Sequence, residues 1–267
     1  MSEPTIGVDV DDLRLGVKSG LRTASALEFR SVELATVAGE VAPANLSSSG
    51  RRHLSHFVKS LGLELSSLTA DIPGLRIADP STVGERVERT CQIIELAADL
   101  NVPVVSASLG AITHPDTQEP SPHALDALRR IGEFADSRGR VYALRPSVDS
   151  CDQLAGVLDL LNCPALGVSF DPAGMIMVGT NPFSSIERLI EQIAVIQARD
   201  GTVGGTERTG HETPLGEGDV DWESVLAVLR AAEYDSPLVL RRTDSQRPIE
   251  DIQRARDVLT RMLWNSH

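Results

Sequence analysis

Short apolar, β-branched segments alternate with longer segments of helical periodicity along the whole chain, and this alternation constrains the fold most strongly. It is typical of parallel strands joined by helical crossovers. The strands are expected at residues 5–10, 31–34, 63–68, 102–105, 141–144, 166–170, 193–198 and 237–240. Eight strand-helix units predict a closed (β/α)8 TIM barrel. An open doubly wound sheet would normally carry a glycine-rich loop after its first strand, and none follows residue 10.

Capping residues predict where several helices begin and end. The triplet Asn45-Leu46-Ser47 is a capping signal for a helix that ends near Gly62, and Pro122 lies in the first turn of a helix that ends near Gly139. Asp221 is a good N-cap for a helix that starts at the next residue. No low-complexity linker interrupts these elements, so residues 1–267 are expected to form one TIM-barrel domain.

Composition limits the possible partners and location. The formal net charge is −13 and aromatic residues make up 3% of the chain, which disfavours nucleic acid and anionic membranes. There is no apolar segment of membrane-spanning length and no signal-peptide pattern at the start, so a cytoplasmic protein is expected. The three cysteines lack metal-ligand spacing and are expected to be reduced.

Four phrases of the chain resemble, in the right order, the xylose isomerase-like barrels. This family includes sugar and sugar-phosphate isomerases, ketose epimerases and related apurinic endonucleases. The phrases cover residues 62–68, 86–105, 166–172 and 214–222. The last of them, Pro-Leu-Gly-Glu-Gly-Asp-Val-Asp-Trp, is the most distinctive. The resemblance covers nearly the whole chain and implies a TIM barrel with its site at the carboxyl ends of the strands.

The resemblance also implies which positions carry the site. Active members bind a divalent cation such as Mn, Zn, Co or Mg through Glu, Asp, His and Glu after strands five to eight. The matching positions here are Arg145, Asp171, Gln197 and Arg241. Only Asp171 retains the family's ligand type, so no metal or other cofactor is predicted.

The charges at these positions suggest a degenerate metal site. Asp171 with the two arginines gives a net positive charge, and a guanidinium does not lose its proton to admit a cation. In one interpretation Arg145 and Arg241 form ion pairs with Asp171 and fill the old metal position. In another they face the cavity and bind a carboxylate, phosphate or sugar phosphate.

A third interpretation is an enzyme that transfers protons without a metal. Asp200, Glu217 and His211 are the candidate bases, although Glu217 fits a solvated loop before the helix capped by Asp221 better than a catalytic role. The glycine-rich segment 201–214 contains Arg208 and His211 and is a candidate to close over a ligand, with Arg208 as a ligand contact.

The leading hypothesis is therefore a pseudoenzyme of the sugar phosphate isomerase/epimerase type. It would bind a small ligand such as a sugar or sugar phosphate without metal-dependent catalysis. The alternative is an active sugar or sugar-phosphate isomerase or epimerase that works metal-free or holds a divalent metal through unusual ligands. An endonuclease is disfavoured because the chain is acidic and poor in ligand residues. Oligomeric state and ligand identity stay open.

Overall fold

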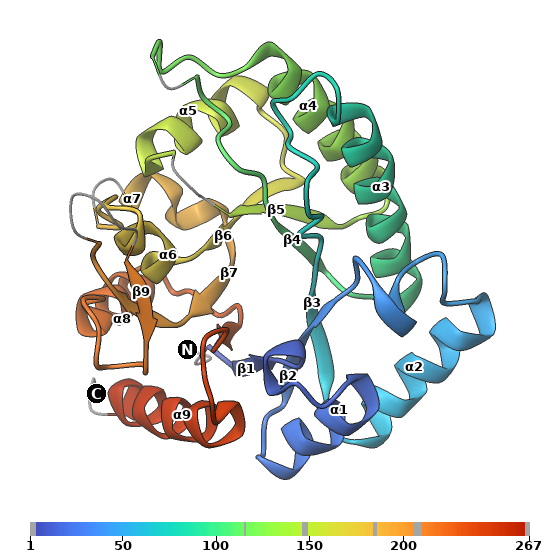
Figure 1. Cartoon of the computed structure of the whole chain (residues 1–267), viewed down its shortest axis with the longest axis vertical. Helices are drawn as coiled ribbons and strands as arrows, with labels where there is room; N and C mark the ends of the chain where they lie inside the picture. The colour runs from blue at the N-terminus through green and yellow to red at the C-terminus, as the bar shows by residue number, and fades with distance from the viewer. Residues whose placement is uncertain (1–3, 115, 146–148, 184–185, 205–209, 265–267) are drawn as a thin grey trace.

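Eight parallel strands close into a barrel surrounded by helices (Figure 1), which confirms the predicted fold class. The computed structural model describes residues 4–114, 116–145, 149–183, 186–204 and 210–264. Around the barrel the strand order is β1-β10-β7-β6-β5-β4-β3-β2. The strands are β1 (Ile6–Asp9), β2 (Ser31–Ala35), β3 (Glu64–Thr69), β4 (Val104–Ser108), β5 (Val141–Arg145), β6 (Leu166–Phe170), β7 (Ile193–Ala198) and β10 (Leu238–Leu240). Each lies at a predicted strand position.

The helices surround the barrel and follow the predicted caps. The longer ones are α1 (Val17–Ala26), α2 (Ser48–Ser60), α3 (Val83–Leu100), α4 (Pro122–Ser137), α5 (Cys151–Leu161), α8 (Trp222–Ala231) and α9 (Pro248–Trp264). Ser47 and Asp221 accept backbone hydrogen bonds as N-caps. Gly62 has φ +72° at the end of α2, a conformation that glycine adopts without strain. Within the described residues, no helix is long and apolar enough to cross a membrane.

The segment after β6 differs most from the prediction. A short helix, α6 (Pro172–Met177), follows β6. The helical periodicity of residues 182–192 predicts one helix there, whereas the structure has α7 (Ile186–Leu189) followed by a 3-10 turn, η3 (Ile190–Gln192). The predicted loop 201–214 contains part of an antiparallel hairpin, β8 (Asp200–Thr202) with β9 (His211–Thr213). The remaining 3-10 turns are η1 (Asp11–Leu13) and η2 (Gly39–Val41).

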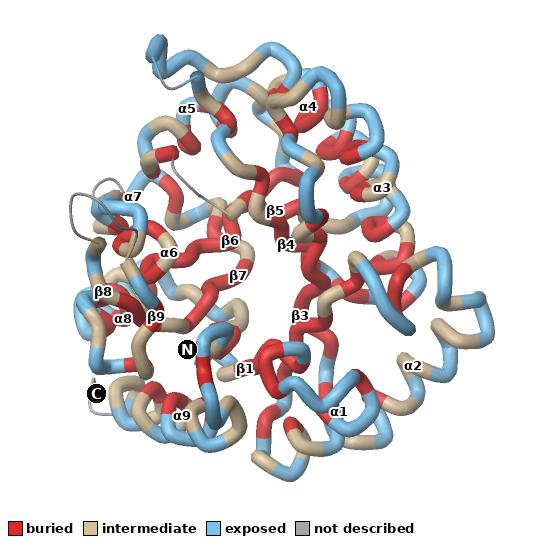
Figure 2. The backbone as a smooth tube through the Cα atoms, in the orientation of Figure 1, coloured by how far each residue is buried: buried red, intermediate tan, exposed pale blue. Residues whose placement is uncertain are grey.

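Two apolar layers hold the barrel together. The larger core lies between the strands and the helices, and Figure 2 shows buried backbone along the strands and exposed backbone on the outer helix surfaces. A small second cluster lies inside the barrel and consists of Val104, Ala143, Val195 and Val239. The side chains above this cluster, toward the carboxyl ends of the strands, are mostly polar. That end is called the barrel mouth below.

Candidate functional site at the barrel mouth

The four positions implied by the family resemblance all lie at the barrel mouth. Arg145 ends β5, Asp171 follows β6, Gln197 lies in β7 and Arg241 follows β10. Gln197 accepts a hydrogen bond from Arg241 Nη1 at 3.0 Å. The ion pairs of Asp171 go elsewhere, as described below, so these positions contribute to three separate ionic groups.

Arg241 lies among three buried carboxyl groups. Its Nε is 2.8 Å from Asp12 Oδ2 and 3.1 Å from Asp9 Oδ2, and its Nη1 is 3.4 Å from Glu33 Oε1. The exposed fractions are 1% for Asp9, 8% for Asp12 and 0% for Glu33. Burial by itself lowers the pKa of Arg241, but these carboxylates raise it well above its ordinary value. Arg241 therefore stays charged and is largely neutralised by its neighbours.

Glu33 extends into the barrel interior and joins strands from both sides of the mouth. Its Oε2 accepts hydrogen bonds from Ser67 Oγ at 2.5 Å and Ser106 Oγ at 3.3 Å, and Gln197 Nε2 lies at 3.5 Å. Because these donors belong to β3, β4 and β7, Glu33 fixes the arrangement of the mouth.

Asp9 ends β1 directly beside Glu33 of β2 in the sheet register. Burial raises the pKa of Asp9 to about 8; Arg241 opposes this, whereas Asp12 and Glu33 reinforce it. One cation lies among three buried carboxyl groups, an arrangement that favours the protonated form of one of them.

Arg145 forms a second ionic group on the opposite side of the mouth. Its Nη1 is 2.9 Å from Asp71 Oδ2, and its Nη2 donates to Ser106 Oγ at 3.2 Å. Asp71 also accepts a hydrogen bond from Ser108 N. Burial raises the pKa of Asp71, but Arg145, the Ser108 hydrogen bond and Arg241 together lower it below its ordinary value. Arg145 Nε is buried without a hydrogen-bond partner, so one donor of this guanidinium is still free.

Arg199, which sequence reasoning did not single out, is the ionic partner of Asp171. Its Nε lies 3.0 Å from Oδ1 and its Nη2 2.5 Å from Oδ2, a bidentate pair. Asp171 also caps α6 by accepting a hydrogen bond from Gly174 N at 2.9 Å. Burial favours the neutral acid, but Arg199, with smaller contributions from Arg145 and the Gly174 hydrogen bond, lowers the pKa of Asp171.

Glu212 attaches the β8–β9 hairpin to this third group. It is 8% exposed and lies 2.8 Å from Arg242 Nη1 and 3.3 Å from Arg199 Nη1. Thr243 Oγ1 donates to it as well, at 2.5 Å. Arg242 continues the chain of ion pairs to Asp251 at 3.2 Å. The hairpin is thus fixed to the rim of the mouth.

These contacts correct the predicted ion pairing. Arg145 and Arg241 do not form ion pairs with Asp171, because each has nearer carboxylates and Arg199 takes both oxygens of Asp171. The predicted net positive charge of the mouth is also wrong. Among the described residues, the three groups join seven carboxyl groups to four guanidinium groups: Asp9, Asp12, Glu33, Asp71, Asp171, Glu212 and Asp251 with Arg145, Arg199, Arg241 and Arg242.

The three candidate bases do not converge on this network. Asp200 is fully buried and accepts backbone hydrogen bonds from Gly201, Gly216 and Val220, so it anchors the loop beside the hairpin. His211 is exposed and bonded to Thr202, and Glu217 is exposed in a loop. Arg208 lies outside the described residues.

The missed residues had a signal in the sequence. Asp9, Asp12, Glu33 and Asp71 stand at or just after predicted strands one to three, where a barrel places its site. Attention to strands five to eight alone, which the family resemblance suggested, left them out.

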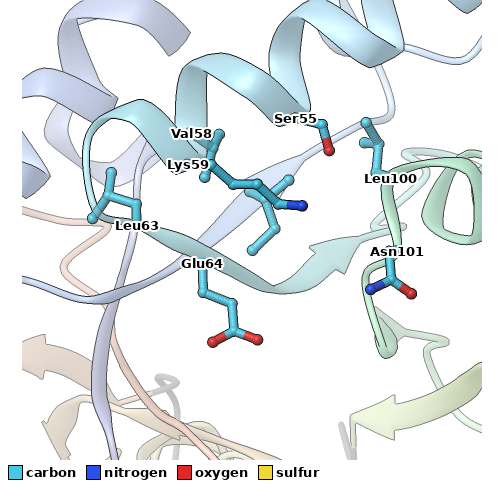
Figure 3. Close-up of a pocket in the computed structure, with 8 residues that line it drawn as sticks. Ser55, Val58, Lys59, Leu63, Glu64, Leu100 and Asn101 are labelled. Atoms are coloured by element: carbon cyan, nitrogen blue, oxygen red, sulfur yellow. The ribbon is translucent and has the colours of Figure 1, made fainter.

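A pocket of about 280 Å³ lies at the opposite end of the barrel (Figure 3). It is formed where α2 and α3 end and β3 begins, with Lys59, Glu64 and Asn101 around it. The amino-terminal face of such barrels serves mainly stability, so the mouth is the better functional candidate. Among the described residues, no group of three or more His, Cys, Asp or Glu side chains is arranged to hold a metal ion.

Fold and mouth together define a parallel (β/α)8 barrel with its polar site at the carboxyl ends of the strands. The xylose isomerase-like TIM barrel family model matches residues 21–262, and the chain belongs to this family. Among curated proteins, none matches the sequence.

Solved structures of low sequence identity share the fold. A xylose isomerase domain protein from Planctomyces limnophilus has a TM-score of 0.85 and 22% identity, with 98% of this chain and 97% of that chain covered. A D-tagatose 3-epimerase-like protein has a TM-score of 0.81 and 20% identity, with 98% of each chain covered. A xylose isomerase-like barrel from Mycobacterium smegmatis in complex with magnesium has a TM-score of 0.78 and 15% identity, with 100% and 99% covered.

Proposed function

We propose that the barrel mouth binds a small, uncharged, polyhydroxylated ligand of the sugar class, and that it does so without a divalent metal. The observation that carries this proposal is the placement of the guanidinium groups. Arg145 and Arg241 occupy two of the four positions where the family resemblance places metal ligands, and Arg199 engages both oxygens of the remaining carboxylate, Asp171.

The residues present do not fit a divalent cation. A cation beside Asp171 would have to displace the bidentate Arg199, and burial leaves little solvent to screen its repulsion from Arg145 and Arg241. Gln197 offers an amide oxygen, but that oxygen already accepts a hydrogen bond from Arg241. The structural neighbour from Mycobacterium smegmatis, by contrast, was solved in complex with magnesium.

The charge balance favours an uncharged ligand over the anion expected from the sequence. Each of the four arginines already contacts at least one carboxylate, and carboxyl groups outnumber guanidinium groups. An added carboxylate or phosphate would compete with these internal partners. Sugar hydroxyls both donate and accept hydrogen bonds, so they match a mouth built from carboxylates, guanidinium groups, serines and an amide.

Thermal unfolding with ketoses tests this proposal. Two structural neighbours are a D-tagatose 3-epimerase-like protein and an L-ribulose 3-epimerase, so D-tagatose and L-ribulose are reasonable probes. With EDTA present, a ketose at about ten times its Kd should raise the Tm by about 3 °C through mass action. Phosphate and citrate at matched ionic strength should raise it less.

Arg145→Met is the matched control for this measurement. It removes the free Nε donor, and it also corrects for the general stabilising effect of sugars on proteins. The shift should be lost in this variant. An equal shift in both proteins, or a larger shift with phosphate than with either ketose, is the result that rejects the proposal.

A further inference from the structure

We propose that Asp9 and Glu33 form an acid–base pair that moves a proton on a keto sugar bound at the mouth, without a metal. This inference rests on the proposed function and adds the reaction type and its two catalytic residues. It replaces Asp200, Glu217 and His211 as candidates for proton transfer.

The pairing of strands β1 and β2 places the two carboxyl groups next to each other. Asp9 and Glu33 are register partners on the adjacent parallel strands β1 and β2, so both side chains point into the barrel. They share Arg241, whose Nε is 3.1 Å from Asp9 and whose Nη1 is 3.4 Å from Glu33. A single guanidinium therefore holds both groups in fixed positions.

Burial makes it costly for both groups to carry a charge at once. Asp9 is 1% exposed and Glu33 is fully buried, and Asp12 adds a third carboxyl group beside Arg241. Like charges at this spacing retain a proton, as carboxyl pairs do in other acid–base sites. The raised pKa of Asp9, about 8, agrees with a pair that holds one proton at neutral pH.

The barrel interior next to the pair is lined by small polar side chains. Most TIM barrels fill these layers with bulky branched residues. Here Ser31 lies two residues before Glu33, and Ser169 pairs in register with Val195 of the inner cluster, so both point inward. The hydroxyl oxygens of Ser31 and Ser169 are buried and have no hydrogen-bond partner. These unpaired hydroxyls are independent evidence for a polar ligand reaching this depth.

The proposed step conserves atoms and charge. The Glu33 carboxylate takes the proton from the carbon next to the ligand's carbonyl group, and the C–H electron pair forms a C=C bond. The carbonyl π electrons move to the oxygen, which takes the proton of the Asp9 carboxylic acid. The product is an enediol, and the pair still holds one proton, now on Glu33. Reversal of the step at the other face or the neighbouring carbon gives the epimer or isomer.

Deuterium incorporation tests the step directly. The purified protein is incubated with D-tagatose or L-ribulose in D2O containing EDTA, and the loss of the proton signal beside the carbonyl is followed by NMR. Wild type should catalyse exchange above the protein-free rate. Asp9→Asn and Glu33→Gln should each reduce it by about 100-fold, while the surface variant Asp159→Asn, 65% exposed at its side chain, should not.

Each other outcome overturns the inference. No exchange by wild type with either ketose overturns the proposed step, and a ketose-dependent Tm shift in that case leaves the binding proposal standing. Exchange that EDTA stops, or that persists in both variants, assigns the chemistry to other groups.

The pH dependence of stability gives a readout that does not require activity. The folded-state pKa of Asp9 is raised from 3.8 to about 8, so its proton stabilises the fold fully below pH 4, and this contribution is lost as the pH rises through 8. Arg241, Asp12, Glu33 and Asp11 are the charged groups that act on it. Wild type should lose several degrees of Tm between pH 6 and 9, and Asp9→Asn should lose clearly less. Parallel pH profiles would show that Asp9 holds no proton at neutral pH and overturn the pair.

Discussion

Replacing Arg241 by methionine is expected to lower the free energy of unfolding by about 3–5 kcal/mol, a fall in Tm of roughly 6–15 °C for a chain of this size. The physical reason is the loss of the only cation in contact with Asp9, Asp12 and Glu33 among the described residues. Methionine retains much of the apolar stem, so most of the loss reports charge rather than packing. Chemical denaturation at pH 7 measures it.

Two control variants isolate the electrostatic cause. Arg145→Met removes a cation whose partner, Asp71, is 38% exposed at its side chain, so the loss should be near 1 kcal/mol. Adding Asp12→Asn to Arg241→Met removes one of the uncompensated carboxylates and should restore part of the stability. Equal losses for the Arg145 and Arg241 variants, with no recovery in the double variant, would show that the carboxyl cluster does not depend on Arg241.

Arg199→Met is expected to lower the free energy of unfolding by a similar amount, about 3–5 kcal/mol, because it leaves Asp171 buried without its bidentate partner. Glu212 retains Arg242, so the fold as a whole should persist. The effect should also be local: amide exchange in the β8–β9 hairpin should accelerate more than exchange in the barrel strands, since Glu212 loses one of its two cations.

The dependence of stability on pH below neutrality gives a second test of the Arg199→Met variant. The low pKa of Asp171 contributes stability above its unfolded value near 4, which is lost as the pH falls. Wild type should therefore lose more stability than Arg199→Met between pH 6 and pH 3. Arg188→Met, whose ion pairs with Asp152 and Asp159 lie on the surface, is the matched control and should change stability by less than about 1 kcal/mol. Uniform amide exchange in the Arg199 variant would reject the hairpin attachment.

The fold could be predicted from the sequence because its signals are local and repeated. Most barrel strands are short and rich in apolar residues, and caps such as Ser47 and Asp221 mark helix starts without reference to distant residues. The short helix α6 was missed although Asp171 and Pro172 form a capping signal, because Asp171 was interpreted only as a metal-ligand position.

The site could be predicted only in part because ion pairing is a long-range property. The sequence placed Arg145, Gln197 and Arg241 at the mouth correctly, since strand ends converge in a barrel. It could not rank their partners, because the choice depends on distances across the mouth: Arg241 is 208 residues from Glu33, and Arg145 is 74 from Asp71. A charge count limited to the family positions therefore gave the wrong sign.

Metal content is the most direct test of the central claim, that this mouth works without a divalent cation. Protein purified without chelator and dialysed against metal-free buffer is analysed by plasma mass spectrometry for manganese, magnesium, cobalt and zinc. We predict that each falls well below one ion per chain, and that neither EDTA nor added manganese changes the Tm. About one tightly held ion per chain, with a Tm that EDTA lowers, would contradict the claim.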